Sequence, residues 1–269
     1  MPGASPSSPL GQTSGASPGP ATGQPSRRKR ALYVVGFLAW VFLGFMLAQA
    51  LVLATIWGLG QLGVSFAIIN ETVFNAAGSA VIYALSIILI IGAPWLIKKR
   101  KTSRQEVGLN VLPRWIDFLW TPAGMIIYLI LTSLVTALAT YLLPFIDYNQ
   151  AQETGYSQIA TRPEYFLAFI SLVIIAPIAE EVLFRGYLLA KLKKYAPVWL
   201  AVLLTSLLFG IVHFQWNVGI DVFVLSLVLC FLRLVSGSLW PSIMLHMLKN
   251  GIAFYFLFVN PALLNILGG

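Results

Sequence analysis

Charged residues are scarce in this sequence. Lys, Arg, Asp and Glu make up 10% of its 269 residues and hydrophobic residues make up 58%, whereas about a quarter of a soluble domain is charged. Several nearly uncharged runs exceed the roughly 18 residues that indicate a helix able to cross a bilayer. The scarcity of charge therefore excludes an ordinary soluble domain and predicts an all-α, polytopic membrane protein.

Cysteine is almost absent as well. Cys230 is the single cysteine of the chain and lies in an apolar run. A lone cysteine excludes both an internal disulfide and a cysteine-rich zinc site. We therefore interpret Cys230 as a small buried hydrophobic residue.

Acidic residues are fewer than basic ones, with 9 Asp and Glu against 17 Lys and Arg and a net charge of +8. The basic residues form short clusters beside apolar runs: "RRKR" at 27–30, "KKRKTSR" at 98–104 and "KLKK" at 191–194. Positive residues that flank membrane spans on the cytoplasmic side produce this pattern. The excess charge therefore predicts contact with the lipid bilayer and no nucleic-acid partner.

The chain divides into a tail and a membrane domain. Residues 1–30 form a polar, Pro-, Ser- and Gly-rich segment that ends in the first basic cluster, and we expect it to be disordered. Residues 31–269 form the expected transmembrane domain, without a convincing internal repeat. Seven spanning helices are predicted in it, at 31–59, 73–97, 119–143, 165–190, 197–215, 219–235 and 239–259.

The distribution of positive charge predicts the orientation. If the spans alternate, all the basic clusters fall on one side, which we expect to be the cytoplasm and to hold the N-terminus. An odd number of spans then places the C-terminus outside. We expect the membrane to be the plasma membrane of a bacterial cell. The segment 105–118 mixes polar and apolar residues, and we expect an interfacial helix there with Trp115 and Trp120 as anchors.

The stretch "APIAEEVLFRGY" at 176–187 places Glu180, Glu181 and Arg185 inside the fourth span. A charge at the centre of a bilayer costs at least about 2.5 kcal/mol, so these residues should face the protein interior and have partners. Glu181 and Arg185 are four positions apart, which places them on one helix face as an ion pair. Glu180 points about 100° away, so its partners must come from other helices.

Two later spans contain residues that could be those partners. The chain has only two histidines, His213 in the fifth span and His246 in the seventh. Asn250 follows His246 by four positions and Phe209 precedes His213 by four, so each pair shares a helix face. Each residue could also be an ordinary interhelical contact, but together they form a coherent set for hydrolysis.

Hydrolysis of an amide needs an activated water, a donor for the developing oxyanion and a proton for the leaving amine. Glu180 is the expected general base and later acid. His213 could orient the water, and Asn250 with His246 could donate to the oxyanion. Alternatively, Glu180, His213 and His246 could bind a zinc ion with water in the open position. The residues by themselves leave both mechanisms open.

The three motifs resemble those of a known family. "EEVLFR" at 180–185 fits its EExxxR motif, "FGIVH" at 209–213 fits FxxxH, and "HMLKN" at 246–250 fits HxxxN. In this order, each on its own span, they resemble the CPBP intramembrane proteases, also called the CAAX protease and bacteriocin-processing or Abi family. The similar core covers about 119–259, and "EVGL" at 106–109, ahead of this core, also resembles the family's sequences.

The resemblance implies roles for individual residues. Glu180 would activate water with His213, while Glu181 and Arg185 would hold the helices or support the base. His246 and Asn250 would form the oxyanion side. The family is described both as metalloproteases and as glutamate proteases, so the resemblance leaves the zinc alternative open.

We therefore expect an intramembrane endopeptidase that cleaves a membrane-anchored protein or peptide, with a prenylated or CAAX-like substrate as one alternative. A second interpretation is a non-catalytic membrane scaffold or bacteriocin-immunity protein, in which the polar set is structural. A proton-coupled transporter is disfavoured because such folds usually contain paired repeats.

Overall fold

A computed structural model describes residues 25–99, 101–148, 150, 152–156 and 159–262 of the chain. All the regular structure in this part of the chain is helical. Most of the expected disordered tail, residues 1–24, lies outside the described residues. Its last part differs from the prediction: α1 begins at Arg27, with Ser26 as its N-cap, so the first basic cluster is helical.

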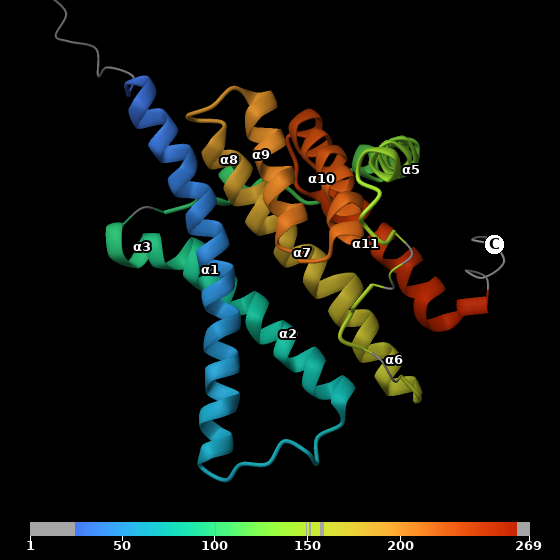
Figure 1. The fold of residues 1–269 in the computed structure, drawn as a ribbon. Coiled ribbons are helices and arrows are strands. Elements are labelled where there is room, and N and C mark those ends of the chain that lie inside the picture. Colours follow the sequence, from blue (N-terminus) through green and yellow to red (C-terminus); the bar gives the residue numbers. More distant parts are fainter. Residues whose placement is uncertain (1–24, 100, 149, 151, 157–158, 263–269) are drawn as a thin grey trace, which may run out of the picture.

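The first two spans are α1 (Arg27–Gln61) and α2 (Glu71–Ile87), which are joined at one end of the molecule (Figure 1). The second span continues through a π-helical turn, η1 (Ile88–Gly92), into α3 (Ala93–Lys98). A proline lacks the backbone N–H and crowds the carbonyl four residues earlier. The wide turn just before Pro94 relieves that conflict.

The segment expected to form an interfacial helix at 105–118 is organised differently. It contains one helical turn, α4 (Arg104–Val107), followed by an irregular stretch, and α5 (Trp115–Leu142) already begins at Trp115. Asp117 accepts the backbone N–H of Arg114 and thereby caps the start of α5. This local cap moves the beginning of the third span four residues ahead of its predicted position.

The fourth span combines five short helical segments. It consists of α6 (Arg162–Phe169), η2 (Ile170–Ile175), α7 (Ala176–Glu181), η3 (Val182–Leu188) and α8 (Leu189–Leu192). The π-helical turn η2 again lies just before a proline, Pro177. Single π-helical turns within α-helices are frequent at functional sites, and two of them flank the six residues of α7.

The remaining helices are α9 (Val198–Ile211), α10 (Trp216–Ser236) and α11 (Trp240–Phe254), which is extended by η4 (Tyr255–Val259). Six helices of the described chain are long and apolar enough to cross a membrane, and α9 is a shorter apolar helix of 14 residues. At 1.5 Å per residue α9 measures about 21 Å, against a hydrocarbon core of about 30 Å. The all-α membrane architecture is confirmed, with the predicted fifth span reduced to this short helix.

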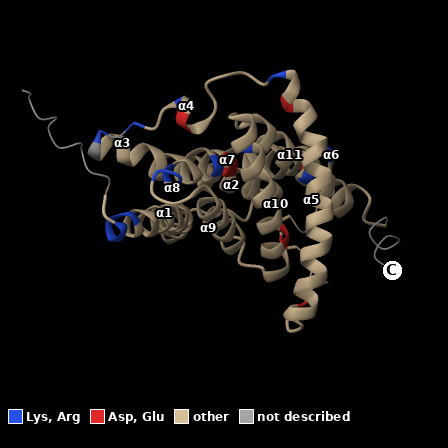
Figure 2. Cartoon of the chain, turned by 90° about the horizontal axis from the view of Figure 1, so that it is seen from above, with Lys and Arg blue, Asp and Glu red and all other residues tan. Residues whose placement is uncertain are grey.

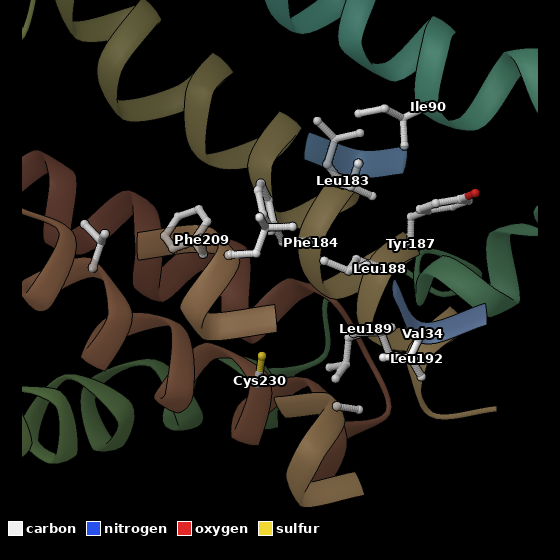
Figure 3. Packing of buried hydrophobic residues seen from close by; sticks show 14 of the residues in the cluster. Val34, Ile90, Leu183, Phe184, Tyr187, Leu188, Leu189, Leu192, Phe209 and Cys230 are labelled. Atoms are coloured by element: carbon white, nitrogen blue, oxygen red, sulfur yellow. The ribbon is translucent and has the colours of Figure 1, made fainter. Parts of the chain in front are cut away.

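The fourth span lies at the centre of the bundle. It runs between the pair α1 and α2 and the group α9, α10 and α11 (Figure 1). The largest hydrophobic cluster is built around Leu183, Phe184 and Leu188 of this span, with Phe209 of α9 on one side and Ile90 of the second span on the other (Figure 3). Residues of the fourth span are therefore surrounded by protein, as its charges require.

Candidate active site

Two adjacent glutamates end α7 and point to different surroundings. The Glu181 side chain is fully buried, whereas 14% of the Glu180 side chain is exposed. Consecutive residues of a helix are separated by about 100°, so each carboxylate contacts a different set of helices. The structure thus separates the two acidic groups as the spacing predicts.

Glu181 contacts two partners through one oxygen. Its Oε1 lies 2.8 Å from Nη1 of Arg185, the ion pair expected from the spacing. The same oxygen lies 2.9 Å from Nδ1 of His246 on α11. A carboxylate that holds one nitrogen of an imidazole directs the other nitrogen. Glu181 therefore also orients a histidine, a contact that the sequence did not reveal.

His246 is held between the two glutamates. Its side chain is 3% exposed, and its Nε2 lies 3.7 Å from Oε2 of Glu180. This separation is too long for a direct hydrogen bond, yet it places one nitrogen of the ring opposite the expected general base. The structure brings Glu180 and His246 together as the sequence anticipated.

Phe209 joins the buried groups. Its ring is fully buried, and the guanidinium carbon of Arg185 lies 4.3 Å from its centroid. The rings of His213 and His246 approach it edge-on, with centroid distances of 5.0 and 5.9 Å. Phe209 thus forms the apolar surface against which the arginine and both histidines pack.

His213 lies two residues beyond the end of α9, outside the regular helix in which it was expected. Its Nδ1 is 2.7 Å from the carbonyl oxygen of Phe209. A carbonyl accepts only, so Nδ1 carries the proton, and Nε2 is the nitrogen left for chemistry. His213 is also within electrostatic range of Glu180, His246 and Lys249.

Asn250 makes a contact that its spacing did not predict. It donates from Nδ2 to the carbonyl oxygen of Leu172 at 3.0 Å, which links α11 to η2. One N–H of an asparagine amide is engaged by this bond, and the amide has a second. Asn250 therefore lies on the expected face of α11, one turn after His246, while half of its donor capacity is used for helix packing.

Sequence reasoning missed the direct hydrogen-bond partner of Glu180. The hydroxyl of Tyr83, on α2, donates to Oε1 of Glu180 at 2.5 Å. Tyr83 lies ahead of the three motifs, which are all in later helices. The available signal was a tyrosine in the largely apolar run "VIYALSIIL" of the second span, since a buried tyrosine hydroxyl usually has a partner.

A second polar cluster lies on the next face of α11. Lys249 and Asp221 of α10 form an ion pair of 3.0 Å. The hydroxyls of Tyr128 and Thr132, both on α5, donate to the other oxygen of Asp221 at 2.5 and 3.0 Å. Asp221 therefore links three helices, α5, α10 and α11.

Zinc was the alternative to an activated water without a metal. Among the described residues, no group of three His, Cys, Asp or Glu side chains is arranged to hold a metal ion. Glu181 contacts Nδ1 of His246, Tyr83 contacts Oε1 of Glu180, and the carbonyl of Phe209 contacts Nδ1 of His213. Metal ligands commonly make such contacts through their other atoms, so these contacts leave Nε2 of each histidine and Oε2 of Glu180 available. The zinc alternative therefore stays a prediction, and we derive no step through a metal.

Comparison with known proteins identifies relatives of the motif-bearing part of the chain. Residues 162–252 match the sequence profile of a family described as "Type II CAAX prenyl endopeptidase Rce1-like". This range contains all three motifs, and the match confirms the resemblance to the CPBP membrane peptidases. No solved structure matches the chain.

Two curated proteins are also similar. The "Uncharacterized 24.3 kDa protein" of Escherichia coli is 36% identical over 90 residues, which cover 32% of this chain and 42% of that protein. The "Putative membrane peptidase YdiL" of Bacillus subtilis (strain 168) is 24% identical over 151 residues, which cover 56% of this chain and 58% of that protein. The chain thus spans about half the length of the curated relatives it matches.

Proposed function

We propose that this chain, a relative of the Rce1-like CAAX prenyl endopeptidases over residues 162–252, is an intramembrane endopeptidase that uses Glu180 to activate water. The observation that supports this most directly is the position of Glu180. Its carboxylate reaches the bundle interior beside His246, whose ring is oriented by a second, fully buried glutamate. A structural ion pair alone requires no such third group.

The first step is proton transfer from water. His213 holds the water, and Oε2 of Glu180 takes one of its protons as the hydroxide oxygen bonds to the carbonyl carbon of the scissile amide. A tetrahedral intermediate with a negative oxygen results. The proton now resides on Glu180, close to the nitrogen of the leaving group.

Donors on α11 stabilise the negative oxygen. His246 has an acceptor at each nitrogen, with Glu181 at Nδ1 and Glu180 facing Nε2, which suits an imidazolium that can donate from Nε2. The second amide N–H of Asn250 adds a further donor. Donors of this kind, fixed in an apolar site, are worth about 10²–10³ in kcat.

Collapse of the intermediate completes the reaction. The C–N bond breaks, and Glu180 returns its proton to the leaving nitrogen. One peptide bond and one water are consumed, and a carboxylic acid and an amine form, so Glu180 ends in its starting state. This cycle uses only groups that lie around α7 in the structure.

The substrate we propose is a membrane-anchored protein or peptide. The site lies between spanning helices, so a scissile bond must enter from the bilayer or from its edge. More specifically, we propose that the substrate carries a prenylated or CAAX-like terminus, and the name of the matching family supports this. Parallel assays with a prenylated peptide and the same unmodified peptide would measure this preference directly.

The test is hydrolysis by the purified chain in liposomes that contain membrane-anchored peptides. We expect Glu180→Gln to lower kcat by at least about 10²-fold, the usual contribution of a general base, with His213→Ala and His246→Ala also strongly impaired. Glu153→Gln is the matched control, because Glu153 is an exposed residue of the loop before the fourth span.

Activity that survives all three site substitutions would end the proposal. The alternative, a non-catalytic scaffold or immunity protein, predicts a different result. In that case the variants would lose function only in proportion to their loss of folded protein, and a folded but inactive Glu180→Gln would contradict it.

A further inference from the structure

The candidate site extends beyond the segment that matches the family. Residues 162–252 include α7, α9 and all but the last two residues of α11, but not α2. The closest hydrogen bond to Glu180 nevertheless comes from α2, through the hydroxyl of Tyr83. A group outside the matched segment therefore contacts the expected general base directly.

Polar contacts fix the position of α2 along the fourth span. Near the start of α2, Asn70 donates to Glu164 at 2.8 Å and Asn75 donates to the carbonyl of Gly155 at 2.6 Å. These bonds tie α2 to the beginning of the fourth span and to the loop before it. A helix anchored in this way cannot slide by a turn without breaking them, so Tyr83 stays level with Glu180.

Packing also holds the ring of Tyr83 in place. On the side of α1, Phe45 lies 6.3 Å from it between ring centroids. The tyrosine is thus placed between an aromatic residue of α1 and the carboxylate of α7. A side chain confined on both sides presents its hydroxyl in one direction.

The two oxygens of the Glu180 carboxylate have different neighbours. Oε1 of Glu180 accepts the Tyr83 hydroxyl, whereas Oε2 lies on the side of His246. A half-turn of the carboxylate only exchanges two equivalent oxygens, whereas any smaller rotation of its plane would weaken the hydrogen bond. The bond therefore leaves Oε2 directed at the place where water must lose its proton.

We infer that Tyr83 is a positioning residue for Glu180, so that α2 completes the active site. The inference rests on the proposed role of Glu180. It assigns Tyr83 no contact with substrate. Loss of the hydroxyl should therefore lower kcat and leave KM nearly unchanged.

The kinetic test is Tyr83→Phe in the liposome assay, beside wild type and Glu180→Gln. A hydrogen bond to a charged group corresponds to about a 10- to 100-fold change in rate. We expect a loss of that size in kcat, with KM within about twofold of wild type. Tyr128→Phe is the matched control, because Tyr128 makes the same 2.5 Å hydroxyl–carboxylate bond to Asp221 and should retain kcat.

Infrared spectroscopy tests the contact without any substrate. The difference between the spectra of wild type and Glu180→Gln isolates the Glu180 carboxyl band. We expect Tyr83→Phe to shift this band and Tyr128→Phe to leave it in place. A band that Tyr83→Phe does not move would overturn the inference, whether or not a cleavable peptide is known.

The two experiments separate failure of the inference from failure of the proposed function. If wild type is active, Glu180→Gln is inactive and Tyr83→Phe is fully active, Tyr83 does not position the base and the proposed function stands. If the infrared band shifts but wild type cleaves no peptide, the contact stands and the proposed chemistry fails. The positioning role would also be rejected if Tyr83→Phe lowers the melting temperature and the smaller amount of folded protein accounts for the whole loss of kcat.

Discussion

At the scale of single residues, each charge of the "EEVLFR" motif has a specific partner. Glu181 contacts both Arg185 and His246 through one oxygen. Glu180 accepts a hydrogen bond from Tyr83 with one oxygen and faces His246 with the other. Burial of a carboxylate is costly unless its oxygens are paired. The two glutamates therefore differ in role because they differ in partners.

Arg185→Ala should destabilise the protein strongly. The guanidinium and Glu181 are both fully buried, and removal of one member of such a pair typically costs about 3–5 kcal/mol because the other charge is left uncompensated. Thermal unfolding in detergent measures this. The double variant Glu181→Gln/Arg185→Met has no stranded charge and should recover much of the loss. Equal instability of both variants would contradict this account.

At the scale of elements, α4 is held against the central span by a charge cluster. Glu106 lies 2.9 Å from Lys191 and 2.6 Å from Lys194 through the same oxygen. A backbone hydrogen bond also holds this segment, because the N–H of Leu239 donates to the carbonyl of Gly108 at 2.9 Å. The segment "EVGL" thus docks on the ends of two spans instead of lying alone at the interface.

Glu106→Gln should weaken the attachment of α4 to the central span in a pH-dependent manner. Burial by itself raises the pKa of Glu106, but Lys194 and Lys191 outweigh burial and hold this pKa below its ordinary value of 4.5. A lowered pKa stabilises the folded state above pH 4.5, and this stabilisation is lost as the pH falls through the pKa of the folded state.

We therefore expect Glu106→Gln to lower the free energy of unfolding by about 1 kcal/mol at pH 7, a value kept small because Lys194 is largely exposed. The difference from wild type should shrink as the pH is lowered below 4.5. Unfolding in detergent at both pH values measures it. A difference that is constant with pH would show that the ion pairs contribute nothing.

At the scale of the whole molecule, basic residues gather at one end of the bundle. Figure 2 shows Lys and Arg at the start of α1, around the end of α3, on α4 and near α8. These elements lie at the ends of alternating helices, as the clusters in the sequence predict. By the positive-inside rule we expect this end to face the cytoplasm.

Labelling with a membrane-impermeant maleimide tests the orientation. Gln105→Cys, in α4, should react only after the membrane is opened, whereas Gln61→Cys, at the far end of α1, should react in intact cells. Both positions are exposed, and the natural Cys230 is buried and serves as the unreactive background. The reverse labelling pattern would show that the basic end of the bundle faces outside.

Much of this protein could be predicted from its sequence because the relevant interactions are local. Apolar length identified the spans, and the four-residue spacing paired Glu181 with Arg185, since both follow from the geometry of a single helix. The boundary of α5 was shifted by a cap at Asp117, and the short α9 left His213 just beyond its helix. Those errors are small because they too are local.

Only the tertiary structure decided which polar groups meet across helices. Tyr83 reaches Glu180 from 97 positions away and His246 reaches Glu181 from 65. Such contacts depend on how whole spans pack, and in lipid that packing follows close fit and interhelical hydrogen bonds rather than apolar periodicity. The π-helical turns around α7 also change the phase of the fourth span, so ideal helical spacing cannot specify which groups its glutamates face.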